Sequence, residues 1–360
     1  MSQSSGPDRL TRVLLSDLTT LRLGGPAASY VEATTEAELV EAVSSADAAG
    51  TPVLLVAGGS NLVVADEGFP GVVIKVATAG VRSDVEACHG PSCSGAMVTV
   101  AAGEDWDAFV ARAVASEWVG IEALSGIPGA VGSTPIQNVG AYGQEVADTI
   151  ASVRVWDRRL RGIRTFTASE CGFGYRHSRF KADPARHVVL DVTFQLRCGT
   201  LGAPVRYAEL ARALGVEQGD RAPLAEVRRE VIALRRSKGM VLDATDHDTW
   251  SAGSFFTNPH LSAEQSAALP DDAPRYPQPD GTVKSSAAWL IERAGFAKGY
   301  GLDLNGGRVS LSTKHTLALT NRGNGTTEEL LALAREIRDG VEKAFGVALV
   351  NEPVAVGVAL

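Results

Sequence analysis

The segment from Gly126 to Gly143 restricts the fold more than any other part of the chain. Its eighteen residues include five glycines, two prolines and no charged side chain. Glycine gives the backbone freedom and allows close approach, whereas Pro128 and Pro135 fix φ. This composition excludes an ordinary helix or strand and predicts a rigid loop around a ligand. A plain surface loop is the alternative, but a loop of this length without structure of its own is uncommon unless it is functional.

The polar side chains of this segment are all neutral hydrogen-bonding groups, namely Ser133, Thr134, Gln137, Asn138 and Tyr142. Hydroxyls and amides suit the edge of a large, flat organic molecule with polar rims. We therefore expect an organic cofactor at this loop rather than a metal ion.

Length and charge exclude several functional classes. With 360 residues, 45% of them hydrophobic, the chain can bury large cores and is long enough for two or three domains. The net charge of -8 and the scattering of basic among acidic residues argue against a nucleic-acid partner. Residues 1–9 lack the apolar core of a signal peptide, and no later run reaches membrane-spanning length. We expect a cytoplasmic protein without membrane insertion.

Two clusters have the residue types of metal ligands, but neither predicts a metal site. Cys88 and Cys93 have a metal-like spacing without a second ligand pair nearby, which favours a turn. The acidic and histidine side chains of residues 243–248 lie in a polar segment, where charges normally face water. The four cysteines are too few and too unevenly spread for a disulfide framework, so we expect reduced thiols.

A second glycine turn, residues 57–61, lies between the apolar runs 51–56 and 62–65. This order predicts a strand, a tight turn and more extended chain. Successive backbone N–H groups in such a turn can bind an anion such as a pyrophosphate. The helix of a Rossmann fingerprint does not follow these glycines. A rival match at residues 323–325 is incomplete and precedes a helix with its own capping box, Thr326 with Glu329.

Strand and helix patterns alternate along the chain and predict an α+β protein. Strand patterns occur at residues 72–76, 98–101, 153–156, 188–196 and 309–319. Helix patterns occur at residues 36–49, 106–117, 224–236, 285–294 and 326–345.

Three further islands combine chemically active side chains: residues 172–181, 251–259 and 351–353. Each alone has a structural reading, with Arg176 as an ion-pair partner, Ser254 as a turn hydroxyl and Glu352 as an exposed carboxylate. Together with residues 20–26 and the two glycine loops, however, they form a set of separate motifs in a fixed order along the chain. In these motifs and their order, the chain resembles the UDP-N-acetylenolpyruvoylglucosamine reductase family, flavoenzymes that complete UDP-N-acetylmuramate in bacterial peptidoglycan synthesis.

The resemblance covers nearly the whole chain and implies an α+β fold. It implies an FAD-binding region of the vanillyl-alcohol-oxidase type, in two α+β subdomains at residues 1–85 and 86–235. An α+β substrate-binding domain at residues 236–345 and a C-terminal strand returning to the active site at residues 346–360 would follow. The implied reaction is reduction of the enolpyruvyl group of UDP-N-acetylglucosamine enolpyruvate, with non-covalent FAD as cofactor and NADPH as co-substrate.

Motif by motif, the resemblance also implies roles for individual residues. The catalytic arginine, proton donor and catalytic glutamate fall on Arg176, Ser254 and Glu352. The implied substrate-binding residues are Tyr175, Tyr207, Lys238 and Asn258. The implied cofactor-binding residues are Arg22, Gly58, Gly59, Ser60, Asn61, Ile127, Pro128, Gly129, Gly132, Ser133, Gln137, Asn138, Gly140, Ala141 and Tyr142.

Two other functions remain open for this chain, and two positions depart from the pattern of the family. An oxidase of the wider fold family would often attach FAD through a histidine in the glycine turn, but Ser60 and Asn61 occupy that turn. A non-catalytic flavin or UDP-sugar binding protein would not need the three catalytic residues together. The departures are an insertion at residues 88–93 and His315, which stands where a neutral side chain is more typical. We expect neither to touch a catalytic motif.

Overall fold

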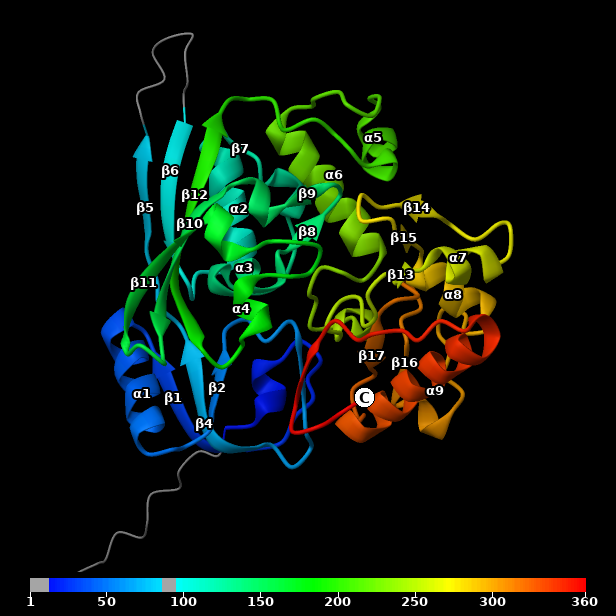
Figure 1. The fold of residues 1–360 in the computed structure, drawn as a ribbon, viewed down its shortest axis with the longest axis horizontal. Helices are drawn as coiled ribbons and strands as arrows, with labels where there is room; N and C mark the ends of the chain where they lie inside the picture. The colour runs from blue at the N-terminus through cyan, green and yellow to red at the C-terminus, as the bar shows by residue number, and fades with distance from the viewer. Residues whose placement is uncertain (1–12, 86–94) are drawn as a thin grey trace, which may run out of the picture.

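A three-stranded parallel sheet begins the fold (Figure 1). The computed structural model describes residues 13–85 and 95–360. In the order β1-β4-β2, the sheet joins β1 (Ala27–Ala33), β4 (Phe69–Val76) and β2 (Val53–Val56). Helix α1 (Glu36–Ala48) makes the crossover between β1 and β2, and a reciprocal capping box of Thr35 and Glu38 fixes its start. The turn between β2 and β3 (Leu62–Val64) holds the second glycine loop, which confirms the predicted strand, turn and strand.

An antiparallel sheet follows and shares a core with the first. Its strands are β5 (Val81–Val85), β6 (Gly95–Ala101), β12 (His187–Cys198), β10 (Ile150–Asp157) and β11 (Gly162–Thr167), in the order β11-β10-β12-β6-β5, with β7 (Trp118–Val119) pairing the end of β12. Trp106 and Phe109 of α2 (Trp106–Ala115) pack against Phe194 of β12. Buried Leu39 and Ile74 belong to the same apolar cluster, so both sheets form one body.

The glycine-rich segment lies beside these sheets as several very short elements. They are the 3-10 turn η3 (Val131–Ser133), the single helical turn α3 (Thr134–Gln137) and a tight pair of strands, β8 (Gly140–Ala141) and β9 (Gln144–Glu145). The expected absence of a long helix or strand is therefore confirmed. Helices α5 (Ala208–Leu214) and α6 (Leu224–Ser237) pack over this region through their own apolar cluster.

The last third of the chain forms a separate apolar core. The hairpin β16 (Val309–Leu311) and β17 (Leu319–Asn321) packs with α9 (Thr327–Phe345) and α8 (Ala287–Arg293). Two short elements complete it: α7 (Ala263–Ala268) and the small sheet of β13 (His260–Leu261), β15 (Val283–Lys284) and β14 (Tyr276–Pro277). The short helix α4 (Arg179–Ala182) belongs to the earlier body, because its Phe180 is buried in the first apolar cluster. The predicted capping box of Thr326 with Glu329 is confirmed at the start of α9.

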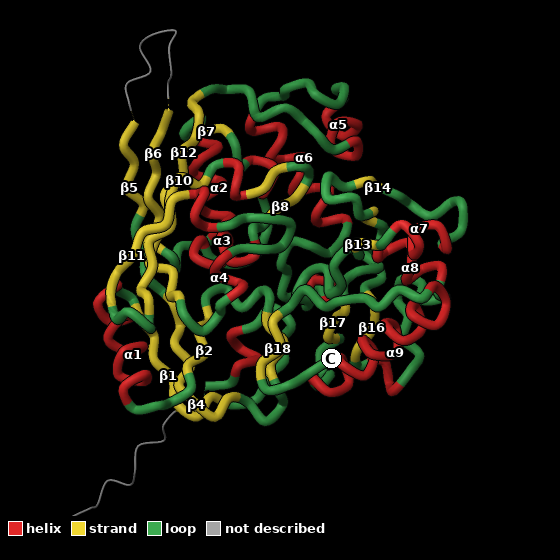
Figure 2. Tube along the Cα trace, viewed as in Figure 1, coloured by secondary structure: helices red, strands yellow, loops and turns green. Residues whose placement is uncertain are grey.

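The final strand returns to the first half of the molecule. β18 (Val354–Val356) pairs in parallel with β3, opposite Leu62, Val63 and Val64. Figure 2 shows β18 between the β1-β4-β2 sheet and the C-terminal helices. Residues 351–353, which precede β18, are thereby held between the two halves.

The predicted α+β class is confirmed, as are the helices expected near residues 36, 106, 224, 285 and 326, with small shifts at their ends. The single strand predicted over residues 309–319 is wrong. The chain reverses between Leu311 and Leu319, so that β16 and β17 pair with each other as a hairpin. This turn carries His315. The predicted turn at Cys88 and Cys93 lies outside the described residues.

Candidate active site

One cavity of about 740 Å³ brings the two glycine loops and the three chemical islands together. Such a volume suits a small-molecule or cofactor site. Of the residues predicted for the site, those that line the cavity are Gly58, Gly59, Ser60, Asn61, Ile127, Pro128, Gly129, Gly132, Ser133, Gln137, Gly140, Ala141, Tyr142, Arg176, Tyr207, Lys238, Ser254 and Glu352. The predicted residues outside this lining are Arg22, Asn138, Tyr175 and Asn258.

The two glycine loops touch each other at the cavity wall. A Cβ atom added at Gly58 would lie 2.4 Å from the Cα atom of Gly129, so neither loop tolerates a side chain at this crossing. At Gly59, an added Cβ would lie 1.8 Å from the carbonyl oxygen of Leu18. The Gly59 position is therefore fixed by packing against the chain before β1, and a bulky residue there would disturb the fold as well as any bound ligand.

Gln137 offers the cavity an unused donor. Its Oε1 atom accepts a hydrogen bond of 2.9 Å from Lys181 Nζ, while its buried Nε2 has no partner within residues 13–85 and 95–360. A buried donor without a partner is unfavourable, and a ligand with an acceptor edge would satisfy it. The neutral donors and close backbones of this wall thus fit a flat cofactor such as a flavin.

Arg176 is held in position by the glycine-rich segment. Its guanidinium donates to the carbonyl oxygens of Asn138 at 3.4 Å and Gly140 at 3.1 Å. Its Nε lies 2.8 Å from Oε1 of Glu352 as an ion pair, without the alignment of a hydrogen bond. The Asn138 side chain is itself occupied, because its amide donates to Glu145 and to the Gly174 carbonyl. Asn138 therefore shapes the loop that orients Arg176.

Backbone hydrogen bonds bring Glu352 next to Ser254. The Glu352 N–H donates to the carbonyl of Phe255 over 2.8 Å, and the Thr257 N–H donates to that of Val350 over 3.0 Å. On the other side, the Val354 N–H donates to the Asn61 carbonyl over 2.9 Å. The C-terminal segment thus connects the glycine turn with the serine motif, and the three residues predicted to be catalytic line one cavity.

His315 contradicts the expectation that it would not touch a catalytic motif. Its Nε2 lies 3.5 Å from Ser254 Oγ, and it lines the same cavity. Burial lowers the pKa of His315 to about 4, and the positive charges of Lys238, Lys298 and Arg235 act in the same direction. The imidazole is therefore neutral at physiological pH. This contact was not predicted because residues 309–319 were expected to form one strand, whereas they form a hairpin whose turn carries His315.

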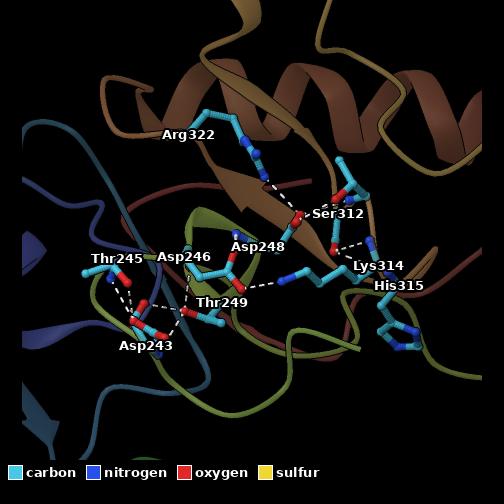
Figure 3. A network of polar contacts seen from close by, with 10 residues as sticks. Asp243, Thr245, Asp246, Asp248, Thr249, Ser312, Lys314, His315 and Arg322 are labelled. Atoms are coloured by element: carbon cyan, nitrogen blue, oxygen red, sulfur yellow. Dashed lines mark hydrogen bonds and ion pairs between the residues drawn. The ribbon is translucent and has the colours of Figure 1, made fainter. Parts of the chain in front are cut away.

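A polar network holds the turn that carries His315 (Figure 3). Ser312 Oγ accepts from the backbone N–H groups of Lys314, at 3.0 Å, and His315, at 3.2 Å. Asp248 accepts from the Thr313 N–H over 2.8 Å and from Arg322 over 2.9 Å. Asp248 is only 4% exposed, so the expectation that the charges of residues 243–248 face water is wrong for it.

The residues predicted to bind substrate form two groups. Lys238 lies 2.5 Å from Glu209 as an ion pair, and the ring of Tyr207 packs edge-on against Tyr142. The second group lies outside the cavity lining, where Asn258 is close to the phenol of Tyr175 and its side-chain oxygen accepts from the Ala287 N–H over 3.0 Å. The cation of Lys284 also lies over the Tyr175 ring, at 5.1 Å.

Arg22 lies apart from both groups. It is exposed, and its guanidinium lies 5.0 Å from the ring centre of Trp250. A role for Arg22 at the cofactor stays a prediction.

Other residues of the cavity wall were missed by sequence reasoning. Arg235 is 7% exposed, and its Nε has no hydrogen-bond partner in the described part of the chain. Burial lowers the pKa of Arg235 to about 10. The sequence does contain a pattern that could have identified Arg235. It continues the four-residue spacing of Val227 and Val231 on the apolar face of α6. His187 also lines the wall and is 8% exposed, but no motif marks it.

Among residues 13–85 and 95–360, no group of three or more His, Cys, Asp or Glu side chains could hold a metal ion. None of the helices in these ranges is long and apolar enough to cross a membrane.

Comparison with known proteins gives consistent matches to the two halves of the chain. A family model described as "FAD binding domain" matches residues 27–160, and one described as "UDP-N-acetylenolpyruvoylglucosamine reductase, C-terminal domain" matches residues 244–356. The chain is similar to proteins named UDP-N-acetylenolpyruvoylglucosamine reductase from Streptomyces avermitilis, at 57% identity, and Cutibacterium acnes, at 56%. Each match covers 96% of this chain, with 94% of the first relative and 89% of the second.

A solved structure supports the fold. The crystal structure of UDP-N-acetylenolpyruvylglucosamine reductase from Thermus caldophilus matches with a TM-score of 0.61 at 24% identity. The match covers 97% of this chain and 99% of that one.

Proposed function

Because the chain belongs to the UDP-N-acetylenolpyruvoylglucosamine reductase family, we propose that it reduces UDP-N-acetylglucosamine enolpyruvate to UDP-N-acetylmuramate for peptidoglycan synthesis. FAD would be the cofactor, and NADPH would be the source of the reducing equivalents. The observation that carries the proposal is the convergence of Arg176, Ser254 and Glu352 on the cavity walled by the two glycine loops. Domain boundaries at residues 85, 235 and 345 belong to the same proposal.

FAD would be held without a covalent bond by the two glycine loops. Ser60 and Asn61 occupy the turn of the first loop, so no histidine is available there for attachment. The free Nε2 of Gln137 and the backbone of Gly58 and Gly129 give the cavity wall donors and close approach. When bound, the flavin would accept hydride from NADPH and deliver it to the terminal carbon of the enolpyruvyl group.

The three catalytic residues would manage the charge and the proton. Hydride addition to the terminal carbon pushes negative charge into the substrate carboxylate, which becomes enediolate-like. The fixed cation of Arg176, held in place by its ion pair with Glu352, would stabilise that charge. Ser254 would then protonate the neighbouring carbon. A serine hydroxyl is a weak acid, but the intermediate is a strong base, so a positioned hydroxyl can suffice.

The substrate's UDP group would lie toward Lys238, Tyr207, Tyr175 and Asn258. Lys238 is paired with Glu209 in this structure, and a pyrophosphate would offer the ammonium a second anionic partner. The aromatic pair of Tyr142 and Tyr207 provides a surface for a sugar or a base.

Two measurements test the proposal. Purified protein should be yellow, and acid precipitation should release all the colour into the supernatant. NADPH oxidation should require UDP-N-acetylglucosamine enolpyruvate and yield UDP-N-acetylmuramate. Colour that stays with the precipitate would contradict non-covalent FAD. Oxygen-dependent turnover of an alcohol or sugar would favour an oxidase, and flavin binding without turnover would favour a binding protein.

A further inference from the structure

We propose that His315 is a positioning residue for Ser254: its Nε2–H donates a hydrogen bond to Ser254 Oγ and directs the serine's own hydrogen toward the substrate carbon. This inference rests on the proposed function of Ser254 as the proton donor. It adds a residue that the sequence motifs did not place at the catalytic centre.

The geometry gives His315 a fixed relation to Ser254. His315 Nε2 and Ser254 Oγ are 3.5 Å apart, at the long end of hydrogen-bond distances, as is common for catalytic contacts before a substrate is bound. The backbone on the His315 side is anchored by Ser312 and, through Thr313, by buried Asp248 (Figure 3). The backbone on the Ser254 side is anchored because the N–H of the next residue, Phe255, donates to the Leu317 carbonyl over 2.7 Å. The segment that carries Ser254 is therefore hydrogen-bonded to the same turn that carries His315.

The direction of the hydrogen bond follows from what Ser254 must do. A hydroxyl carries one hydrogen, so a serine that donates to the imidazole cannot donate to the substrate. A neutral imidazole protonated at Nε2 instead donates a hydrogen bond to a lone pair of Oγ, which leaves the hydroxyl hydrogen free to point toward the substrate. Burial and the neighbouring cations of Lys238, Lys298 and Arg235 keep the ring neutral, with Glu209 opposing them.

The proton balance closes without a change in the protonation of His315. Ser254 gives its hydroxyl proton to the carbon next to the carboxylate, where the electron pair of the enediolate forms the new C–H bond. The oxygen of Ser254 is left with a negative charge, and a solvent proton restores the hydroxyl. During the transfer, the Nε2–H of His315 stabilises the developing charge on Oγ as an oxyanion donor does. The hydride and the proton together saturate one carbon–carbon double bond.

The half-reactions of the FAD-loaded enzyme test the inference. Stopped-flow absorbance of the flavin times reduction by NADPH and reoxidation by the enolpyruvyl substrate separately. His315→Ala should slow reoxidation about 10- to 100-fold and leave reduction unchanged. His315→Gln, whose amide nitrogen corresponds to Nε2, should recover most of the rate, whereas His315→Asn should not. His247→Gln is the matched control, because the His247 ring packs against Trp250 and does not line the cavity.

A double variant separates positioning of Ser254 from direct contact with the substrate. In a Ser254→Ala background, His315→Ala should cause almost no further loss, because its effect acts through the absent hydroxyl. Losses that multiply would overturn the inference. If Ser254→Ala slows reoxidation and His315→Ala does not, the inference about His315 is wrong, while the proposed role of Ser254 stands. If Ser254→Ala has no effect, the proposed role of Ser254 fails first.

A spectroscopic measurement checks the tautomer without turnover. Long-range ¹H–¹⁵N NMR of the holoenzyme with ¹⁵N-histidine should include the signals of a neutral ring, protonated at Nε2, that disappear in His315→Gln. Those signals should stay in the neutral form from pH 6 to pH 8. If the signals that disappear belong to a ring protonated at Nδ1, or to a charged ring, the inference is overturned, even if His315→Ala fails to fold.

Discussion

Left-handed backbone conformations occur at several residues that the motifs assigned to the candidate site, including Tyr142 and Arg176 in the cavity wall. Within the described residues, the non-glycine positions with positive φ are Arg22, Glu117, Asn138, Tyr142, Arg161 and Arg176. Four of these six are residues that the motifs assigned to the site. A left-handed conformation costs a residue with a Cβ about 1–2 kcal/mol, and such positions concentrate where function needs a fixed geometry. At Arg176, φ is 50° and the guanidinium reaches two loop carbonyls.

His315 should make stability depend on pH at the acidic end. Its folded pKa of about 4 lies below the ordinary value of 6.5, so between these values the unfolded chain binds more protons. The contribution is fully present above pH 6.5 and is lost as the pH falls toward 4. The free energy of unfolding, measured with denaturant from pH 7 to pH 4, should therefore fall less steeply with decreasing pH for His315→Gln than for the native protein. Identical slopes would show that His315 titrates alike in both states.

At the scale of single elements, the turn between β16 and β17 depends on a contact from outside itself. Asp248→Ala should lower the free energy of unfolding by about 3 kcal/mol, because it leaves Arg322 and the Thr313 N–H without their buried partner. The control is Asp272→Ala, which removes an exposed ion pair with Arg293 and should cost about 0–1 kcal/mol. Equal losses in the two variants, measured by urea unfolding, would contradict this role for Asp248.

This turn also shows how far sequence could predict the elements. Helices with a clear apolar period were predicted well, because α1, α6 and α9 carry that period and their own caps or amphipathic face. Residues 312–316 contain no glycine, proline or asparagine, so nothing local marks a reversal of the chain. The reversal depends on the Ser312 side chain and on distant Asp248. Contacts of this kind decide which side chain meets Ser254, and local patterns do not encode them.

At the scale of the whole molecule, the C-terminal segment closes the site across the two halves of the chain. Val354→Pro removes the N–H that bonds to Asn61, and it also changes a side chain that is 45% exposed and lines the cavity. Glu352 should then lose its alignment with Arg176, and reoxidation by the enolpyruvyl substrate should slow by about tenfold or more. Val354→Ala keeps the N–H and controls for the lost side chain, so it should slow reoxidation much less than Val354→Pro. Equal rates for both variants would argue against this closure.

A single cavity also predicts the kinetic order of the two substrates. NADPH and the enolpyruvyl substrate must reach one flavin in turn, so initial-velocity plots should give parallel lines, as ping-pong kinetics require. Intersecting lines would contradict the shared site.

The most direct test of the central claim is the separate timing of the two half-reactions in Ser254→Ala. Flavin content and reduction by NADPH should stay near native values, while reoxidation by UDP-N-acetylglucosamine enolpyruvate slows by about 10²- to 10⁴-fold, because only that step needs a proton at carbon. Ser254→Cys keeps a transferable proton and should recover part of the rate. Equal slowing of both half-reactions, or no slowing of reoxidation, would contradict the assignment of Ser254 as the proton donor.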